Sequence, residues 1–247
     1  MSNIFSCYKV PELNLTKAFI NTLEHTDINL SQKYLNEYNF KSKFKKTHFK
    51  NIRYEQEVSF QSIAERLNLK EKNIGSGRVD GVLRSENLVI YIESKYGTRF
   101  REKQLNNYQK ILSKEKAEWR ILLLISDSKK DLENVKFRVY KNIDVFTDDW
   151  NHISEFCESI KEKLENKDLQ KYSKDIFLLD QLSEYLSEMG VVSFKGFTKP
   201  QIYTLENRDL SKPQYLDDKL KDQITKLFGG TKKNLIELGF DEEGFTW

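Results

Sequence analysis

A short apolar run that ends in charged residues constrains the fold of this chain most strongly. Residues 88–92 are apolar at every position and lead directly into Glu93, Ser94 and Lys95. Such a run is typical of a strand that is buried on both faces. Because successive side chains on a strand alternate between faces, we expect Glu93 and Lys95 on one face and Ser94 on the other. These two charged groups need partners, since burying an unpaired charge is costly.

A second acid, Asp80, lies just upstream on a β-prone run at residues 78–83. Residues 85–87 are expected to join the two runs as the loop of a hairpin. Two carboxylates on adjacent strands can hold a hard divalent cation through oxygen. The ammonium group of Lys95 would then face a phosphate group or an attacking water. The alternative is an ordinary surface hairpin on which Glu93 and Lys95 form a solvated pair.

The order of these residues resembles the signature of the PD-(D/E)XK nuclease superfamily. Asp80 is followed, after twelve residues, by the acid-serine-lysine triplet at residues 93–95. Gln104 and Tyr108 come next with the spacing Gln-x-x-x-Tyr, which is similar to the motif on the following helix in the RecB-type branch.

The resemblance extends upstream of the triplet and covers residues about 10 to 160. Glu12 begins a segment that looks like the acid-bearing first helix of some members of the superfamily. Val79 stands where the name of the superfamily has a proline, which is a common departure.

This resemblance implies an α/β fold with a restriction-endonuclease-like core, in which a mixed sheet of four or five strands is flanked by helices. It also implies a magnesium-dependent nuclease that hydrolyses phosphodiester bonds of DNA, as an endonuclease in antiphage defence, restriction or repair. Mg²⁺, or Mn²⁺ in its place, would be held by Asp80, Glu93, the backbone carbonyl of Ser94 and Glu12. Lys95 would orient the attacking water and stabilise developing charge.

Gln104 and Tyr108 are four residues apart, so on a helix they would be neighbours on one surface. The resemblance implies that they brace the site and hydrogen-bond a phosphate of the scissile strand. The alternative is a helix whose tyrosine packs on the sheet. Glu12 would lie in the first turn of a helix, where the alternative to a metal ligand is an acid stabilised by the helix dipole.

The segments after the motif predict the rest of a sheet. Residues 101–114 have the apolar spacing of a helix, and residues 119–125 form a continuous apolar run. Together they fit a β-α-β crossover onto a parallel strand. Residues 143–146 are a shorter strand candidate, and Asp148 or Asp149 is placed to cap the helix that follows.

A basic segment at residues 41–53 precedes these strands. It contains no acid, and its six cationic residues are Lys41, Lys43, Lys45, Lys46, Lys50 and Arg53. A patch of this kind suits contact with a phosphate backbone, which is independent of sequence and weakened by salt. The alternative is a solvated loop, because most runs of charged residues lie in solvated segments. The whole chain has a net charge of only +3, so binding to nucleic acid has to be argued from this local patch.

The 247 residues divide by pattern into two regions. We expect a nuclease core over residues 1–167 and a mainly helical region over residues 168–247. A helix is predicted at residues 176–189 and closed by Gly190. The C-terminal helices would mediate dimerisation, grip substrate or bind a partner protein, and the sequence does not choose among these.

Several other classes of protein are disfavoured by composition. Cys7 and Cys157 are far apart, which argues against a zinc site and a disulfide scaffold. No run approaches the roughly 20 apolar residues that span a bilayer, so we expect a cytoplasmic protein without membrane contact. Two alternatives to an enzyme stay open. One is a nucleic-acid-binding subunit of a larger complex with little or no cleavage of its own, and the other is an assembly protein that works through its C-terminal helices.

Overall fold

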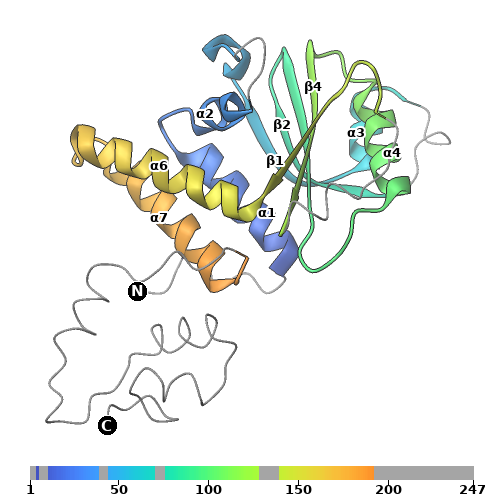
Figure 1. Cartoon of the computed structure of the whole chain (residues 1–247). Helices are drawn as coiled ribbons and strands as arrows, with labels where there is room; N and C mark the ends of the chain where they lie inside the picture. Colours follow the sequence, from blue (N-terminus) through green and yellow to red (C-terminus); the bar gives the residue numbers. More distant parts are fainter. Residues whose placement is uncertain (1–3, 6–10, 39–43, 70–75, 128–138, 192–247) are drawn as a thin grey trace, which may run out of the picture. The chain divides into compact units, whose positions relative to one another are not determined.

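The computed structural model describes residues 4–5, 11–38, 44–69, 76–127 and 139–191, and the side chains of residues 11–13 are outside this description. Its centre is a five-stranded sheet with the order β1-β2-β3-β4-β5 (Figure 1). The strands are β1 (Arg53–Ser59), β2 (Arg78–Arg84), β3 (Leu88–Ser94), β4 (Trp119–Ser126) and β5 (Asp144–Asp149).

The sheet is mixed. Strands β1, β2 and β3 form an antiparallel meander, and β3, β4 and β5 run parallel to one another. The helix α4 (Glu102–Leu112) lies between β3 and the parallel strand β4, which is the crossover that the sequence predicts. The prediction of an α/β fold with a mixed sheet of four or five strands flanked by helices is therefore confirmed.

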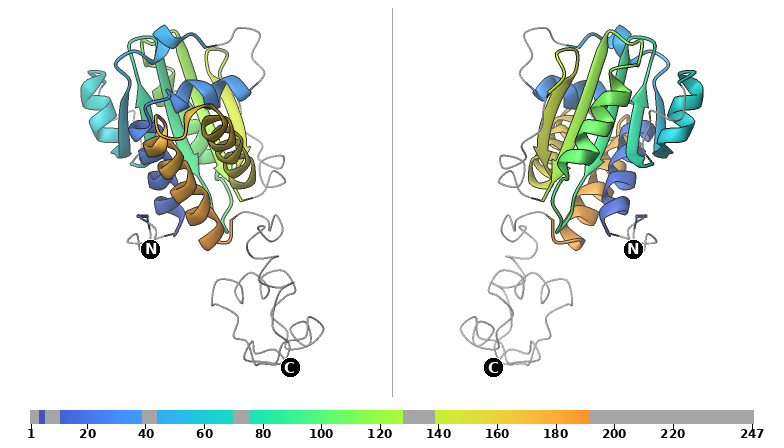
Figure 2. Two further views of the ribbon diagram at one scale, coloured as in Figure 1. Left: turned by 90° about the vertical axis from the view of Figure 1, so that its left-hand side faces the viewer. Right: turned by 90° about the vertical axis from the view of Figure 1, so that its right-hand side faces the viewer.

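Helices cover both faces of the sheet (Figure 1 and Figure 2). One face shares a core with α1 (Pro11–His25), α2 (Leu30–Glu37), α6 (Trp150–Asp168) and α7 (Ser173–Glu188). The other face packs against α3 (Phe60–Arg66) and α4. Strand β3 is buried along its whole length, with Ile90 and Ile92 in the first core and Val89 and Tyr91 in the second. No helix within the described ranges is long and apolar enough to cross a membrane.

A glycine lets α1 approach β2 closely beside Asp80. A Cβ atom at Gly81 would lie only 2.1 Å from Cδ1 of Ile20, which is fully buried on α1. Any larger residue would collide with this side chain. Gly81 therefore fixes how closely α1 lies against the strand that carries Asp80.

Asp148 and Asp149, at the end of β5, perform different tasks. Asp149 caps α6, because its Oδ1 accepts the backbone N–H of His152 at 2.9 Å. The buried Asp148 instead accepts hydrogen bonds from the hydroxyls of Tyr34 and Tyr38, each at 2.5 Å, and lies 2.8 Å from Nδ1 of His152. Of the two residues that the sequence offers as the cap, Asp149 has that role, and Asp148 fastens the end of α2 to β5 and α6.

The helix α7 belongs to the same compact unit as the sheet. Its residues Leu179, Leu182 and Leu186 are buried in the core that it shares with α1 and α6, and the unit ends at Val192. The core therefore extends past residue 167, the boundary expected from the sequence, because the apolar side of α7 covers α1 and α6. Gly190, with a φ of +67°, follows α7 as predicted. Residues 193–247 form a second unit that lies outside the described residues, and so do any dimer or partner contacts expected there.

Candidate active site

Asp80 and Glu93 lie opposite each other on neighbouring strands. Gly81 on β2 pairs with Ile92 on β3, so the next step of this antiparallel register pairs Asp80 with Glu93. Oδ2 of Asp80 accepts a hydrogen bond from the backbone N–H of Ser94 at 3.0 Å. The two acids that the sequence places on adjacent strands are therefore neighbours in space.

Three side chains bind the carboxylate of Glu93. Its Oε1 lies 2.6 Å from Nζ of Lys95 and accepts a hydrogen bond from Nε2 of Gln104 at 2.7 Å. Its Oε2 accepts a hydrogen bond from the hydroxyl of Tyr108 at 2.5 Å. The Tyr108 hydroxyl also accepts from Nε2 of Gln104 at 2.6 Å and lies 2.7 Å from the carbonyl oxygen of Arg78. One turn of α4 thus brings both residues of the Gln-x-x-x-Tyr motif onto the acid at the end of β3.

Burial and charge set the protonation of this cluster. Glu93 is 0% exposed. Burial, followed by the negative charge of Asp80, raises the pKa of Glu93 to about 7, although Lys95 and Tyr108 act in the opposite direction. Burial and the charge of Glu93 also raise the pKa of Tyr108. The phenol therefore stays protonated and acts as a hydrogen-bond donor.

Ser94 points to the opposite face of the sheet, as strand alternation predicts. Its hydroxyl oxygen lies 2.5 Å from that of Thr16 on α1, and both side chains are buried. The backbone N–H of Lys95 donates to the carbonyl of Ile125 at the end of β4 at 2.8 Å. The triplet is thus held from both faces, since α4 contacts Glu93 while α1 and β4 contact the two residues after it.

A third acid, Glu57 on β1, lies beside Asp80 and is not part of the sequence motif. The flanking pairs of the β1–β2 register place it opposite Asp80. Its φ of 52° is left-handed, which is uncommon for a residue other than glycine. Oε2 of Glu57 lies 2.5 Å from Nζ of Lys17 on α1, and Oε1 lies 2.5 Å from a guanidinium nitrogen of Arg78 on β2. Glu57, Asp80 and Glu93 therefore form a row across three strands, with two cations beside its first member.

The basic segment lies away from this row. Four of its six cationic residues are described and exposed: Lys45, Lys46, Lys50 and Arg53. Arg53 pairs with Arg84, which is four positions along β2 from Asp80, or about 13 Å along the strand. Lys41 and Lys43 lie outside the described residues. The structure thus places the described basic residues at the other end of β1 and β2 from the acids.

The donor set suits a hard divalent cation. Asp80 and Glu93 supply carboxylate oxygens from adjacent strands, and Mg²⁺ is commonly held by one or two carboxylates together with water and substrate oxygens. A divalent cation would also relieve the repulsion from Asp80, which adds to burial in raising the pKa of Glu93. Among the described residues, no three His, Cys, Asp or Glu side chains form a metal cluster. Glu12 lies in the first turn of α1, but its side chain is outside the described residues.

Comparison with known proteins assigns no family to the chain. Searches of family models, of curated proteins and of solved structures find no match to it. The geometry of the site is therefore the evidence for its chemistry. This geometry consists of two adjacent acids, a lysine paired with one of them, and an amide and a phenol that hold the same carboxylate.

Proposed function

We propose that this chain is a metal-dependent nuclease of the PD-(D/E)XK type that hydrolyses phosphodiester bonds of DNA. The contacts at Glu93 support the proposal most strongly. Lys95, Gln104 and Tyr108 all reach its carboxylate, and Asp80 lies opposite. A solvated surface pair, the alternative left open by the sequence, does not fit an acid that is fully buried.

In this proposal Asp80 and Glu93 would hold Mg²⁺, or Mn²⁺ in its place, together with the backbone carbonyl of Ser94 and the carboxylate of Glu12. When bound, the cation supplies Lewis acidity by lowering the pKa of a coordinated water and offsetting the charge of the phosphate. A carboxylate must be ionised to act as a ligand, so Glu93, with its pKa of about 7, has to give up its proton.

Lys95 acts on the reacting groups. Its side chain is 12% exposed, and its ammonium lies 2.6 Å from Oε1 of Glu93. An ammonium group has three N–H donors, so Lys95 can contact an attacking water or a phosphate oxygen while it stays paired with Glu93. A fixed positive charge at this place stabilises the negative charge that develops as the phosphodiester bond breaks.

Gln104 and Tyr108 are positioning residues in this mechanism. Between them they donate to both oxygens of Glu93, which keeps the carboxylate from rotating. Partners of this kind orient a metal ligand and are needed for full metal affinity. The Tyr108 hydroxyl also reaches the carbonyl of Arg78, so it joins α4 to both strands of the site.

Cations near the acids support a nucleic acid as the substrate. Lys17 and Arg78 lie beside Glu57 at the edge of the row of acids, with side chains that are 22% and 51% exposed. They can contact the phosphates that flank the scissile bond, which is a sequence-independent interaction. The exposed residues of the basic segment would contact the phosphate backbone farther along the duplex.

The test is cleavage of closed circular duplex, linear duplex and single-stranded DNA by the full chain with Mg²⁺, with Mn²⁺ and with EDTA. Asp80→Ala is compared with Glu86→Ala, which changes an exposed acid in the loop of the same hairpin. We expect metal-dependent cleavage by the wild type and by Glu86→Ala, and none by Asp80→Ala. Cleavage of the closed circular duplex would show that the enzyme is an endonuclease.

Two results would overturn the proposal. One is cleavage by Asp80→Ala at the wild-type rate. The other is tight, salt-sensitive binding of DNA by the wild type without cleavage in any metal, which would favour a nucleic-acid-binding subunit of a larger complex.

A further inference from the structure

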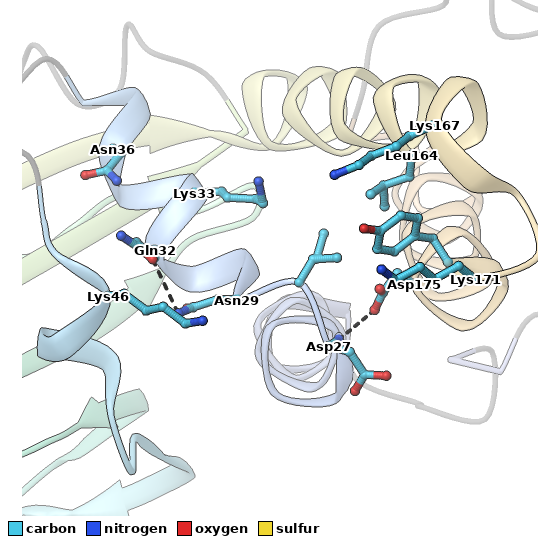
Figure 3. Close-up of a pocket in the computed structure, with 12 residues that line it drawn as sticks. Asp27, Asn29, Gln32, Lys33, Asn36, Lys46, Leu164, Lys167, Lys171 and Asp175 are labelled. Carbon is cyan, nitrogen blue, oxygen red and sulfur yellow. Dashed lines mark hydrogen bonds between the residues drawn. The ribbon is translucent and has the colours of Figure 1, made fainter.

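A polar hollow lies away from the row of acids, at the C-terminal end of α1 (Figure 3). It has a volume of about 740 Å³ and lies between α2, the short 3₁₀ helix η1 (Lys46–Phe49), the end of α6 and the turn before α7. Ligand pockets commonly have volumes of about 300–1,000 Å³. The hollow adjoins the face of the sheet that α1 and α6 cover, whereas Glu93 contacts α4 on the other face.

Four lysines from distant parts of the sequence gather around this hollow: Lys33, Lys46, Lys167 and Lys171. Within the residues that the structure describes, none of their ammonium groups pairs with a carboxylate. In Figure 3, the side chains of Lys33 on α2 and Lys167 on α6 extend toward the same space from opposite sides. Lysine charges that project into one space raise the positive potential there, which favours the binding of an anion.

The two acids that line the hollow are already engaged by other groups. Asp27 pairs with Nζ of Lys174 at 2.9 Å. The buried Asp175 accepts the backbone N–H of Asp27 at 2.6 Å. The four lysines around the hollow outnumber these two acids, so the local charge is positive, and a positively charged cleft concentrates anions.

The walls of the hollow are held by specific contacts. Phe44, which leads into η1, is buried and donates its backbone N–H to Oδ1 of Asn36 at 2.8 Å. Its carbonyl accepts from Nε2 of Gln32 at 2.9 Å. These bonds fasten η1, and with it Lys46, to α2. On the other wall, the ammonium groups of Lys167 and Lys171 lie 5.7 Å and 5.3 Å from the ring centre of Tyr172.

We propose that this hollow binds an anion that carries two or more linked phosphate groups. Lysine is a compact point charge that suits phosphate, and the lysines on both walls can contact different phosphates of one ligand. Such a chain of phosphates occurs in free nucleotides and in the backbone of a polynucleotide. The site shares no residue with the row of acids, and only Lys46 also belongs to the basic segment that the proposed function assigns to the phosphate backbone.

The test is a titration of the full chain with sodium tripolyphosphate, with ATP and with oligothymidylate. The double variant Lys33→Gln/Lys167→Gln is compared with Lys116→Gln/Lys163→Gln, which removes two charges from exposed lysines that do not line the hollow. We expect tripolyphosphate to bind the wild type and the control equally, and the first variant more weakly by about tenfold or more.

The other two probes identify the source of the phosphates. A parallel loss of ATP affinity, with oligothymidylate binding unchanged, assigns the hollow to a free nucleotide, whereas a parallel loss of oligothymidylate affinity assigns it to a polynucleotide backbone. The proposal is overturned if tripolyphosphate does not bind the wild type or if both double variants lose the same affinity. Cleavage by the wild type and by Asp80→Ala is measured separately, so that failure of this site and failure of the nuclease are distinguishable.

Discussion

The hydroxyl of Tyr108, on α4, donates a 2.5 Å hydrogen bond to Oε2 of Glu93 at the end of β3. Both side chains are buried, so no solvent would replace the bond if the hydroxyl were removed. This contact joins the helix of the Gln-x-x-x-Tyr motif to the acid of the triplet. It makes the orientation of the proposed metal ligand depend on a residue that does not touch the metal.

The first prediction concerns Tyr108→Phe, which removes this hydrogen bond but keeps the ring. We expect the variant to fold and to lose about 10–100-fold in Mg²⁺ affinity or cleavage rate, as is typical when the partner of a metal ligand is removed. Tyr54→Phe is the matched control, because it deletes a hydroxyl that bonds Ser31 at 2.8 Å instead. Equal rates for the two variants would show that Tyr108 does not position Glu93.

The second prediction is a pH dependence of stability. The pKa of Glu93 is raised to about 7 in the folded protein from an ordinary value of 4.5. The protonated acid therefore favours folding below about pH 4.5, and this contribution is lost as the pH rises toward 7. In EDTA, Glu93→Gln should gain stability relative to the wild type by roughly 2–3 kcal/mol between about pH 5 and pH 8.

Urea unfolding of both proteins across this range provides the measurement. The difference in the free energy of unfolding between Glu93→Gln and the wild type should grow with pH, because only the wild type has to bury an ionising group. A difference that stays constant would mean that Glu93 ionises in the folded protein as it does in the unfolded chain.

The third prediction concerns the left-handed backbone of Glu57. Glu57→Gly and Glu57→Ala both remove the ion pairs with Lys17 and Arg78. The difference in stability between the two variants therefore reports the effect of the backbone conformation alone. Because the left-handed conformation disfavours any residue that has a Cβ, the glycine variant should be more stable than the alanine variant by about 1–2 kcal/mol. If urea unfolding showed the alanine variant to be as stable as the glycine variant, or more stable, the left-handed conformation of residue 57 would be contradicted.

The fourth prediction concerns a buried ion cluster on the α3 and α4 side of the sheet. Glu115 is 5% exposed and binds Arg84 through both oxygens, at 2.7 and 3.0 Å, with Arg66 at 3.1 Å and Tyr91 at 2.8 Å. Burial alone would raise the pKa of Glu115, but Arg84, Tyr91 and Arg66 hold it below its ordinary value. Its stabilising contribution is therefore present above about pH 4.5 and is lost as the pH falls.

Glu115→Gln should accordingly lower the free energy of unfolding by about 3 kcal/mol near pH 7, because it leaves buried guanidinium charge without its partner. The cost should shrink in acid, where the wild type loses the same interaction. Glu118→Gln, at an exposed acid nearby, should change stability little at either pH. A cost for Glu115→Gln that does not depend on pH would contradict the account.

The sequence predicts that four site residues lie close together, because each of the relationships between them is local. These residues are Asp80, Glu93, Gln104 and Tyr108. A hairpin with a short loop sets the two acids opposite each other, and helical spacing sets the amide and the phenol on one surface. Alternation also predicts that Ser94 faces away, and the structure places it against Thr16. The chemical roles of these residues stay predictions.

Other features depend on tertiary contacts that no local pattern reports. Glu57 is one polar residue among several on a weakly alternating strand, and its left-handed backbone cannot be read from neighbouring residues. Lys33 and Lys167 face each other only because α2 and the end of α6 pack on the same side of the sheet. The change of pattern in the sequence predicts a boundary after residue 167, but Leu182 and its neighbours bury α7 in the core.

The central claim is that Glu93 and its neighbours form a metal-dependent phosphodiesterase centre. The most direct test is the initial rate of DNA cleavage against Mg²⁺ concentration for the wild type, Glu93→Gln and Glu86→Gln. We predict a rate that rises and saturates with Mg²⁺ for the wild type and for Glu86→Gln, and no cleavage by Glu93→Gln at any Mg²⁺ concentration. Cleavage by Glu93→Gln with the wild-type rate and the wild-type dependence on Mg²⁺ would contradict the claim.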